Sequence, residues 1–147
     1  MSESVVEQTT QIASARETVW GLLVNAAGWK SWWSDCVEAL TPDHKPLREG
    51  SELELVLHPR HRKLTFRPVV DMVSEGKTLS LTYRGLFLQF TVVWTVEDGP
   101  TGARVSVRGV FTGFVLWLQG LVSQKDVYRA VLGRNLRDLR KIAERMV

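Results

Sequence analysis

The chain has 147 residues, of which 44% are hydrophobic and 24% charged, and its formal net charge is +3. These values are typical of one ordinary soluble domain. No apolar run approaches the roughly 18 residues of a membrane span, so we expect no stable membrane insertion. Basic residues are mostly mixed with acidic ones, which argues against nucleic acid as a partner. The single cysteine, Cys36, excludes an internal disulfide framework, and the polar N-terminus has no signal-peptide pattern, so we expect a cytoplasmic protein.

The first part of the chain predicts a strand followed by two short helices. The strand covers Ser4–Ile12, where apolar residues alternate loosely with polar ones. Ser14 and Glu17 match the Ser-x-x-Glu capping box, so we expect Ser14 to cap a helix over about Ala15–Asn25. A second helical piece, rich in indoles, is expected at Trp29–Trp33.

The middle of the chain predicts about six strands joined by turns. Pro68 lies inside one of them and should mark a sheet edge or a bulge, because proline cannot donate to the strand ladder. The Asp98–Gly102 segment is a strong hairpin signal. Strands with such short connections must pair antiparallel. The predicted strands are Val37–Leu40, Ser51–Leu57, Lys63–Val73, Thr78–Arg84, Leu86–Glu97 and Ala103–Thr112.

The last part of the chain predicts one long amphipathic helix. From Leu118 onward the apolar residues fall at helical spacing, and charged residues occupy the opposite face. On that charged face, Arg134 and Asp138 are placed for an i,i+4 ion pair. Lys125 interrupts the apolar face. Such a helix needs a long apolar partner, which the preceding strands can supply.

Three stretches resemble the START/Bet v 1-like (SRPBCC) superfamily, which includes the polyketide cyclase/dehydrase and lipid-transport families. They are Ile12–Trp33, Glu97–Val107 and Gly133–Glu144, and the resemblance spans nearly the whole chain. It implies a single domain, 1–147, of the α+β class with a helix-grip fold. In that fold a curved antiparallel sheet of about seven strands wraps around the long C-terminal helix, and two short helices follow the first strand. The resemblance also implies a hydrophobic cavity between sheet and helix.

The inward faces that the alternation predicts converge on one apolar interior. Alternation alone fits either a filled core or a cavity with an apolar ligand, and the resemblance favours the cavity. Two tyrosines could orient a ligand there by hydrogen bonds. A one-residue register error around Pro68 would turn that strand's inward residues outward. The expected cavity residues are Leu55, Leu57, Phe66, Tyr83, Phe90, Trp94, Phe111, Trp117, Leu121 and Tyr128.

The indole cluster of Trp29, Trp32 and Trp33 is expected at the cavity entrance. It could instead plug the end of the sheet, or form an apolar patch for a membrane or partner. Adjacent residues of a helix point in different directions, so at least one of Trp32 and Trp33 should be partly exposed or at the cavity mouth.

No residue stands out as catalytic, and Lys125, Tyr83 and His58 are the candidates. The Lys125 ammonium could reach a ligand oxygen at the cavity mouth, or its stem could cover apolar surface with the charge in water. His58 could act as a base at a strand end or belong to a solvated hairpin tip. A metal site at His58 and His61 would need further ligands, but the candidates His44 and Asp43 lie in a different loop and no Cys pair supports them. No nucleotide-binding motif is present. We therefore expect no metal and no cofactor.

These observations favour binding of a hydrophobic small molecule, such as a lipid, an isoprenoid or an aromatic polyketide, for transport or sequestration. The alternative is a cyclase/dehydratase-type enzyme that uses the same cavity. Few ionisable groups are predicted to face inward, which favours binding over catalysis. A third possibility is an interaction domain that uses the Trp-rich short helices, which would need a filled core and an exposed indole patch. The oligomeric state cannot be predicted.

Overall fold

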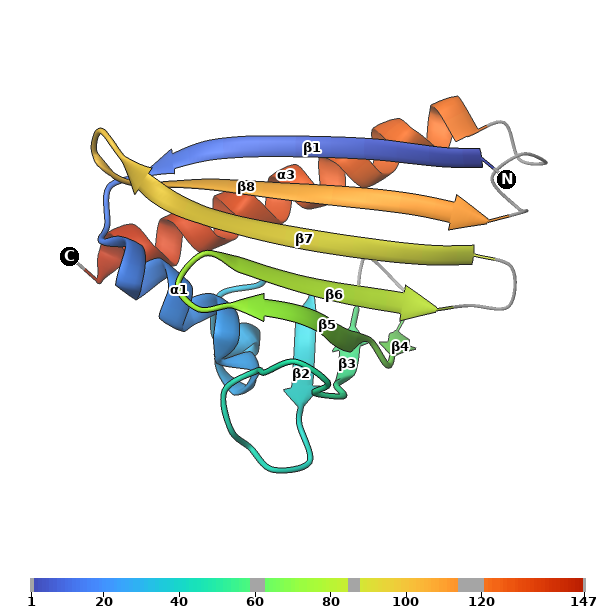
Figure 1. Cartoon of the computed structure of the whole chain (residues 1–147), viewed down its shortest axis with the longest axis horizontal. Coiled ribbons are helices and arrows are strands. Elements are labelled where there is room, and N and C mark those ends of the chain that lie inside the picture. The colour runs from blue at the N-terminus through green and yellow to red at the C-terminus, as the bar shows by residue number, and fades with distance from the viewer. Residues whose placement is uncertain (1, 59–62, 85–87, 114–120, 147) are drawn as a thin grey trace.

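The computed structural model describes residues 2–58, 63–84, 88–113 and 121–146. Its strands form a five-stranded antiparallel sheet in the order β1-β8-β7-β6-β5 and a three-stranded sheet in the order β2-β3-β4. The long helix α3 runs along the large sheet (Figure 1). In chain order the elements are β1 (Ser2–Ile12), α1 (Arg16–Val24), the 3-10 helix η1 (Ala26–Ser31), β2 (Cys36–Leu40), β3 (Glu54–Leu57), β4 (Leu64–Phe66), β5 (Val69–Ser74), β6 (Thr78–Arg84), β7 (Leu88–Gly99), β8 (Gly102–Gly113) and α3 (Leu121–Arg145).

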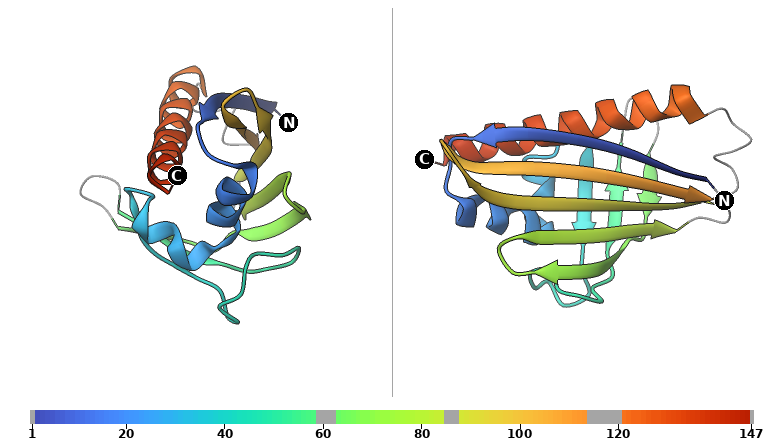
Figure 2. Two further views of the ribbon diagram at one scale, coloured as in Figure 1. Left: turned by 90° about the vertical axis from the view of Figure 1, so that its left-hand side faces the viewer. Right: turned by 45° about the horizontal axis from the view of Figure 1, so that its top comes forward.

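The elements surround one interior. In Figure 2, α3 lies on one side of that interior, the large sheet on another, and the small sheet below, with the short helices at one end. This arrangement is the α+β helix-grip fold that the family resemblance implied. The order of elements is the one the residue patterns predicted: a first strand, two short helices, a run of antiparallel strands and a long final helix.

The strand predicted over Lys63–Val73 is two strands, β4 and β5, and they belong to different sheets. The break falls at Arg67 and Pro68, where proline has no N–H to continue the ladder. The Pro68 carbonyl instead accepts a hydrogen bond from the Leu53 N–H at 3.0 Å. Because the chain crosses between sheets here, the described residues form eight strands rather than about seven.

The capping box predicted for the first helix is wrong. Helix α1 begins at Arg16, its N-cap is Ala15, and no side chain caps it. Ser14 is buried, and a side chain at Gly102 would clash with the Ser14 backbone, so the β7–β8 hairpin packs directly on this residue. The backbone at Ser14 is therefore held against the hairpin just before the helix begins.

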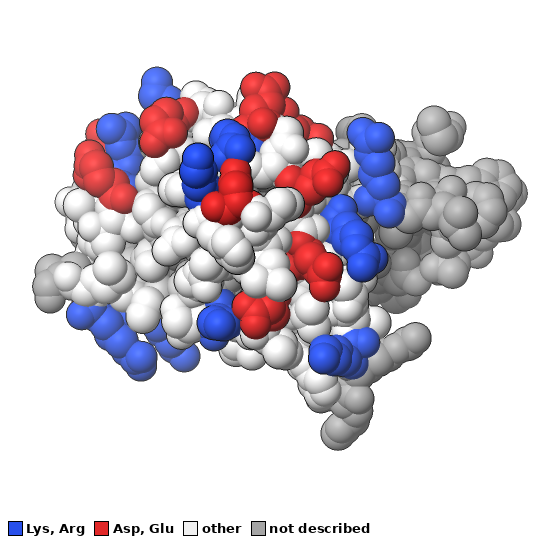
Figure 3. All heavy atoms as spheres, turned by 90° about the horizontal axis from the view of Figure 1, so that it is seen from below, with Lys and Arg blue, Asp and Glu red and all other residues white. Residues whose placement is uncertain are grey.

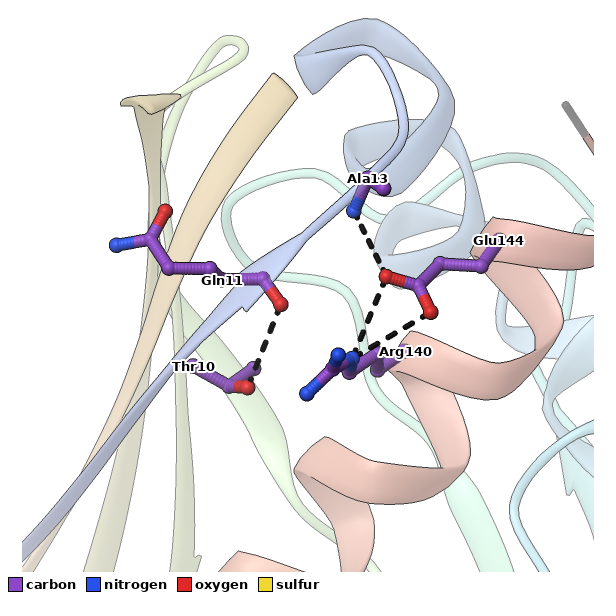
Figure 4. A network of polar contacts seen from close by, with 5 residues as sticks. All are labelled: Thr10, Gln11, Ala13, Arg140 and Glu144. Carbon is purple, nitrogen blue, oxygen red and sulfur yellow. Dashed lines mark hydrogen bonds and ion pairs between the residues drawn. The ribbon is translucent and has the colours of Figure 1, made fainter. Parts of the chain in front are cut away.

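Helix α3 packs against β1 and β8, with its C-terminal half as amphipathic as the spacing predicted. Leu132, Leu136 and Leu139 are buried, whereas Arg137 is exposed. The last turn is tied to the end of β1, as Figure 4 shows: the Ala13 N–H donates to Glu144 Oε2 at 2.8 Å.

Arg140 completes the network of Figure 4. Its Nε lies 3.3 Å from Glu144 Oε2. The Ala13 N–H and then the Arg140 guanidinium lower the pKa of Glu144. The carboxylate therefore joins the first strand to the last helix in its charged form.

Candidate functional site

An internal cavity of about 480 Å³ lies between the two sheets, the short helices and α3. Its volume falls in the range of about 300–1,000 Å³ that is usual for small-molecule sites. Most of its wall is apolar, and aromatic side chains are prominent. The wall consists of Leu23, Trp29, Trp32, Trp33, Asp35, Leu57, Leu64, Phe66, Leu81, Tyr83, Arg84, Phe90, Val92, Trp94, Phe111, Val131, Leu132, Arg134 and Asn135.

Four aromatic rings form a continuous row across the two sheets. Tyr83, Phe90 and Phe111 are paired in register on β6, β7 and β8, so their rings meet on one face of the sheet. The Tyr83–Phe90 ring centroids are 5.8 Å apart and the Phe90–Phe111 centroids 4.2 Å, both stacked. Phe66 on β4 meets Tyr83 edge-on at 5.9 Å. Such contacts fix the rings and offer flat apolar surface to a ligand.

Gly109 makes room for this row. An added Cβ at Gly109 would lie 2.8 Å from Phe90 Cε2 and 3.1 Å from Leu132 Cδ1. A glycine in the middle of β8 therefore lets the Phe90 ring and the helix side chain rest directly on the strand. The role of Gly109 is to allow Phe90 and Leu132 to approach the strand closely.

The three indoles expected at the entrance all belong to the cavity wall. The Trp29–Trp33 ring centroids are 5.7 Å apart, and the Trp32 and Trp33 rings stack at 6.4 Å. Although adjacent, Trp32 and Trp33 both line the cavity, because η1 ends at Ser31 and Trp32 has non-helical φ and ψ of −127° and −26°. The rotation of about 100° per residue in a helix does not apply between them.

Only some polar groups of the wall have hydrogen-bond partners. The Trp29 indole N–H donates to the Leu23 carbonyl at 3.0 Å. By contrast, Nε1 of Trp32, Nε1 of Trp33 and Oδ1 of Asn135 are buried without a partner. Burial, with a smaller contribution from the neighbouring Cys36 thiol, raises the pKa of Tyr83 far above its ordinary value, so its hydroxyl is neutral at physiological pH.

At one part of the wall a loop is tied to helix α3. Arg134 forms an ion pair with Asp35 at 2.9 Å. Asp138 accepts hydrogen bonds from the N–H and the hydroxyl of Ser34, at 3.0 and 2.8 Å. The i,i+4 pair predicted between Arg134 and Asp138 is therefore not formed, because the loop before β2 supplies both with partners.

The structure places six of the ten predicted cavity residues in the wall: Leu57, Phe66, Tyr83, Phe90, Trp94 and Phe111. Leu55 is fully buried, but it packs in the core and is not part of the wall. Trp117 lies outside the described residues, as do the side chains of Leu121, Tyr128 and Lys125.

His58 is exposed at the end of β3 and does not line the cavity. Its backbone N–H donates to the Asp35 carbonyl at 2.8 Å. His61 is not among the described residues, and in the part of the chain that is described no three His, Cys, Asp or Glu side chains gather in a way that could hold a metal ion.

Several wall residues were not predicted from the sequence. Leu81 and Val92 belong to strand faces predicted as inward, so alternation could have included them. Asn135 lies between Leu132 and Leu139 on the apolar side of the helix, and a polar residue there was a usable signal. For Asp35 and Arg134 the sequence held no signal of a place in the wall, because that place depends on which loop reaches α3.

The fold and the cavity define a helix-grip protein with an aromatic-rich internal site. The sequence profile of the family described as "Polyketide cyclase / dehydrase and lipid transport" matches residues 4–146, and the chain belongs to this family. No curated protein matches the sequence. Across residues 2–58, 63–84, 88–113 and 121–146, no helix combines the length and apolar character needed to cross a membrane.

Solved structures with the same fold have low sequence identity to this chain. One is the di-domain ARO/CYC StfQ from the steffimycin biosynthetic pathway, with 16% identity and a TM-score of 0.78; the match covers 98% of this chain but only 51% of that one. The chain thus spans about half the length of that protein. A START superfamily protein from Mycobacterium smegmatis has 15% identity, coverage of 97% and 99%, and a TM-score of 0.77. Ara h 8.0201 has 12% identity, coverage of 97% and 98%, and a TM-score of 0.73.

Proposed function

We propose that this protein binds a hydrophobic small molecule in its internal cavity, for transport or sequestration. The observation that carries the proposal is a cavity of about 480 Å³ whose wall is mostly aliphatic and aromatic. Burial of apolar ligand surface in such a site contributes about 25 cal/mol per Å² before the costs of association. A lipid, an isoprenoid or an aromatic polyketide-like molecule fits this chemistry.

The described wall offers little for acid–base chemistry, which favours binding over catalysis. Tyr83 is neutral because burial raises its pKa, so it is a poor base. The charges of Asp35 and Arg134 are engaged with each other. Arg84 is a permanent cation and cannot accept a proton.

A cyclase or dehydratase activity in the same cavity is the second candidate, and the family description supports it. For that activity Tyr83 and Lys125 are the candidate proton-transfer groups, Lys125 from the sequence alone. Substitutions Tyr83→Phe and Lys125→Met should then abolish turnover of a cyclisable substrate and leave its binding largely intact. Unchanged turnover in both variants would remove these residues as catalysts.

The interaction-domain reading has less support. It needed a filled core and an exposed indole patch, whereas Trp29 and Trp32 are buried, Trp33 is half-buried, and the interior holds a cavity. On the face in Figure 3, basic and acidic side chains are mixed, and no basic stripe suited to a nucleic-acid backbone is visible there. Cytoplasmic location remains a prediction based on the single cysteine.

Native mass spectrometry of the protein purified from its own host tests the binding proposal. We expect a population heavier than the bare chain by the mass of one small organic molecule, released by collisional activation. Protein unfolded, washed and refolded without lipid is the control and should lose the adduct. Only bare chain in the native sample, together with no uptake of added hydrophobic probes, would contradict the proposal.

A further inference from the structure

Three polar atoms of the cavity wall lack a hydrogen-bond partner, and they are of two kinds. Nε1 of Trp32 and Nε1 of Trp33 are donors, and Oδ1 of Asn135 is an acceptor. Trp32 and Asn135 are more than nine-tenths buried, with exposed fractions of 8% and 5%. Buried polar atoms nearly always have a partner, because an unmet hydrogen bond costs free energy. These three therefore need an explanation.

The unmet atoms are confined to the cavity. Across the described ranges, every buried side-chain nitrogen or oxygen found without a partner belongs to one of these three wall residues. Indoles outside this group are satisfied: Trp20 Nε1 donates to Glu75 Oε1 at 3.1 Å, and Trp29 donates to the Leu23 carbonyl. The fold thus supplies a partner even to Trp29 in the same wall, whereas Trp32 and Trp33 are left unmet.

We propose that Trp32, Trp33 and Asn135 form a polar subsite that binds an uncharged hydroxyl group of the ligand. This inference rests on the proposed function and adds the class of ligand: a ring-containing hydrophobic alcohol or phenol. A hydroxyl oxygen accepts from indole N–H groups, and its hydrogen donates to an amide oxygen, so one group satisfies both kinds of unmet atom. The stacked rings of Tyr83, Phe90 and Phe111 supply flat surface for the ring part.

The ion pair next to Asn135 favours a neutral group at the subsite, and Arg84 is the other cation of the cavity wall. Arg134 is one residue from Asn135, but its guanidinium is paired with Asp35 at 2.9 Å, so it adds little net positive charge for an anion. The unmet atoms are shielded from solvent. A ligand therefore reaches these atoms when the side chains rotate. The rotation gives the unmet atoms hydrogen bonds to the ligand and changes the surroundings of both indoles.

Calorimetric titration with four naphthalenes of matched shape tests the subsite. The probes are 2-naphthol (donor and acceptor), 2-methoxynaphthalene (acceptor only), 2-methylnaphthalene (neither) and 2-naphthoate (an anion). We expect Trp32→Phe to weaken 2-naphthol and 2-methoxynaphthalene by about fivefold, the size of one neutral hydrogen bond, with 2-methylnaphthalene unchanged. Asn135→Leu should weaken 2-naphthol alone. Trp29→Phe, whose N–H is already used by Leu23, is the matched control and should show no such selectivity.

Each outcome decides a different point. Equal weakening of all probes in Trp32→Phe and Asn135→Leu would show a purely structural role and overturn the subsite, while the proposed function stands. Tighter binding of 2-naphthoate than of 2-naphthol would also overturn it. If no probe binds the wild-type protein, the proposed function fails and the subsite with it. Should either variant fail to fold, Trp33→Phe and the ranking of the four probes on wild-type protein supply the same test.

Discussion

Arg134 and Asp35 form an ion pair of 2.9 Å that joins helix α3 to the loop before β2 at the wall of the cavity. The pair links two elements about 100 residues apart in the chain. Ser34 and Asp138 make a second link between the same loop and helix. The loop that carries the indole cluster toward the small sheet is therefore held against the helix by polar contacts.

Substitution Arg134→Met should loosen this loop. Because the Arg134 and Asp35 side chains are 44% and 20% exposed, we expect a loss of only about 0.5 kcal/mol in the free energy of unfolding. Dissociation of 2-naphthol should become about two- to fivefold faster, since the loop opens more readily. Stopped-flow displacement measures this rate. Arg137→Met, which removes an exposed arginine from the same helix, is the control, and equal rates in the two variants would contradict the role of the pair.

Substitution Gly109→Ala should disturb the aromatic row. The added methyl would lie 2.8 Å from Phe90 Cε2 and 3.1 Å from Leu132 Cδ1, so both must move. We expect the free energy of unfolding to fall by about 1–3 kcal/mol, as for an overpacked core. Gly21→Ala is the matched control, because nothing lies within 4 Å of its added Cβ and a helix favours alanine by about 1 kcal/mol. Urea denaturation gives both values, and a Gly109→Ala protein as stable as wild type would refute the close packing.

Alkaline pH should destabilise the protein through two buried acids. Burial raises the pKa of Cys36 from 9.0 to about 11. Burial also raises the pKa of Tyr83, to a value higher than that of Cys36. A group whose folded pKa is raised keeps its stabilising contribution below the unfolded value and loses it as pH rises through the folded one. Stability should thus fall between pH 9.0 and about 11. Urea midpoints across this window measure the fall, and Cys36→Ala should make it shallower; an identical slope in the variant would exclude the thiol as a cause.

Acid should weaken the link between β1 and α3. The pKa of Glu144 is lowered from 4.5, first by the Ala13 N–H and then by Arg140. For a lowered pKa, the stabilising contribution is present above the unfolded value and is lost as pH falls through the folded one. We therefore expect melting temperature to fall below pH 4.5, and to fall less in Glu144→Gln, which has no charge to lose. Superimposable acid profiles for the two proteins would contradict this assignment.

Periodicity was enough to predict the elements that are regular along the chain. Leu79, Leu81 and Tyr83 alternate inward on β6, and Leu132, Leu136 and Leu139 form one buried face of α3. Local sequence patterns gave wrong predictions where tertiary contacts determine the local structure. Ser14 matches a capping box, but its backbone packs on the β7–β8 hairpin.

The candidate site divides in the same way. Tyr83, Phe90 and Phe111 could be predicted as neighbours, because alternation and antiparallel pairing put their side chains on one face. The ion pair of Asp35 with Arg134 could not be predicted, because no local sequence pattern determines which loop meets the helix. Asn135 is an intermediate case: its position on the apolar face was visible, but its unmet oxygen is a property of the folded cavity.

The cavity between sheet and helix should be where a hydrophobic small molecule binds. Val92 lines the cavity, and its neighbour Val93 points to the opposite face of β7. Calorimetric titration of 2-naphthol into two variants tests this. Val92→Phe puts a larger side chain into the cavity, whereas Val93→Phe changes the opposite face of the strand and leaves the cavity as it is. We predict that Val92→Phe weakens binding at least about tenfold, an effect of roughly 1.4 kcal/mol, while Val93→Phe binds as wild type does. Equal affinity in both variants would place the ligand elsewhere and contradict the claim.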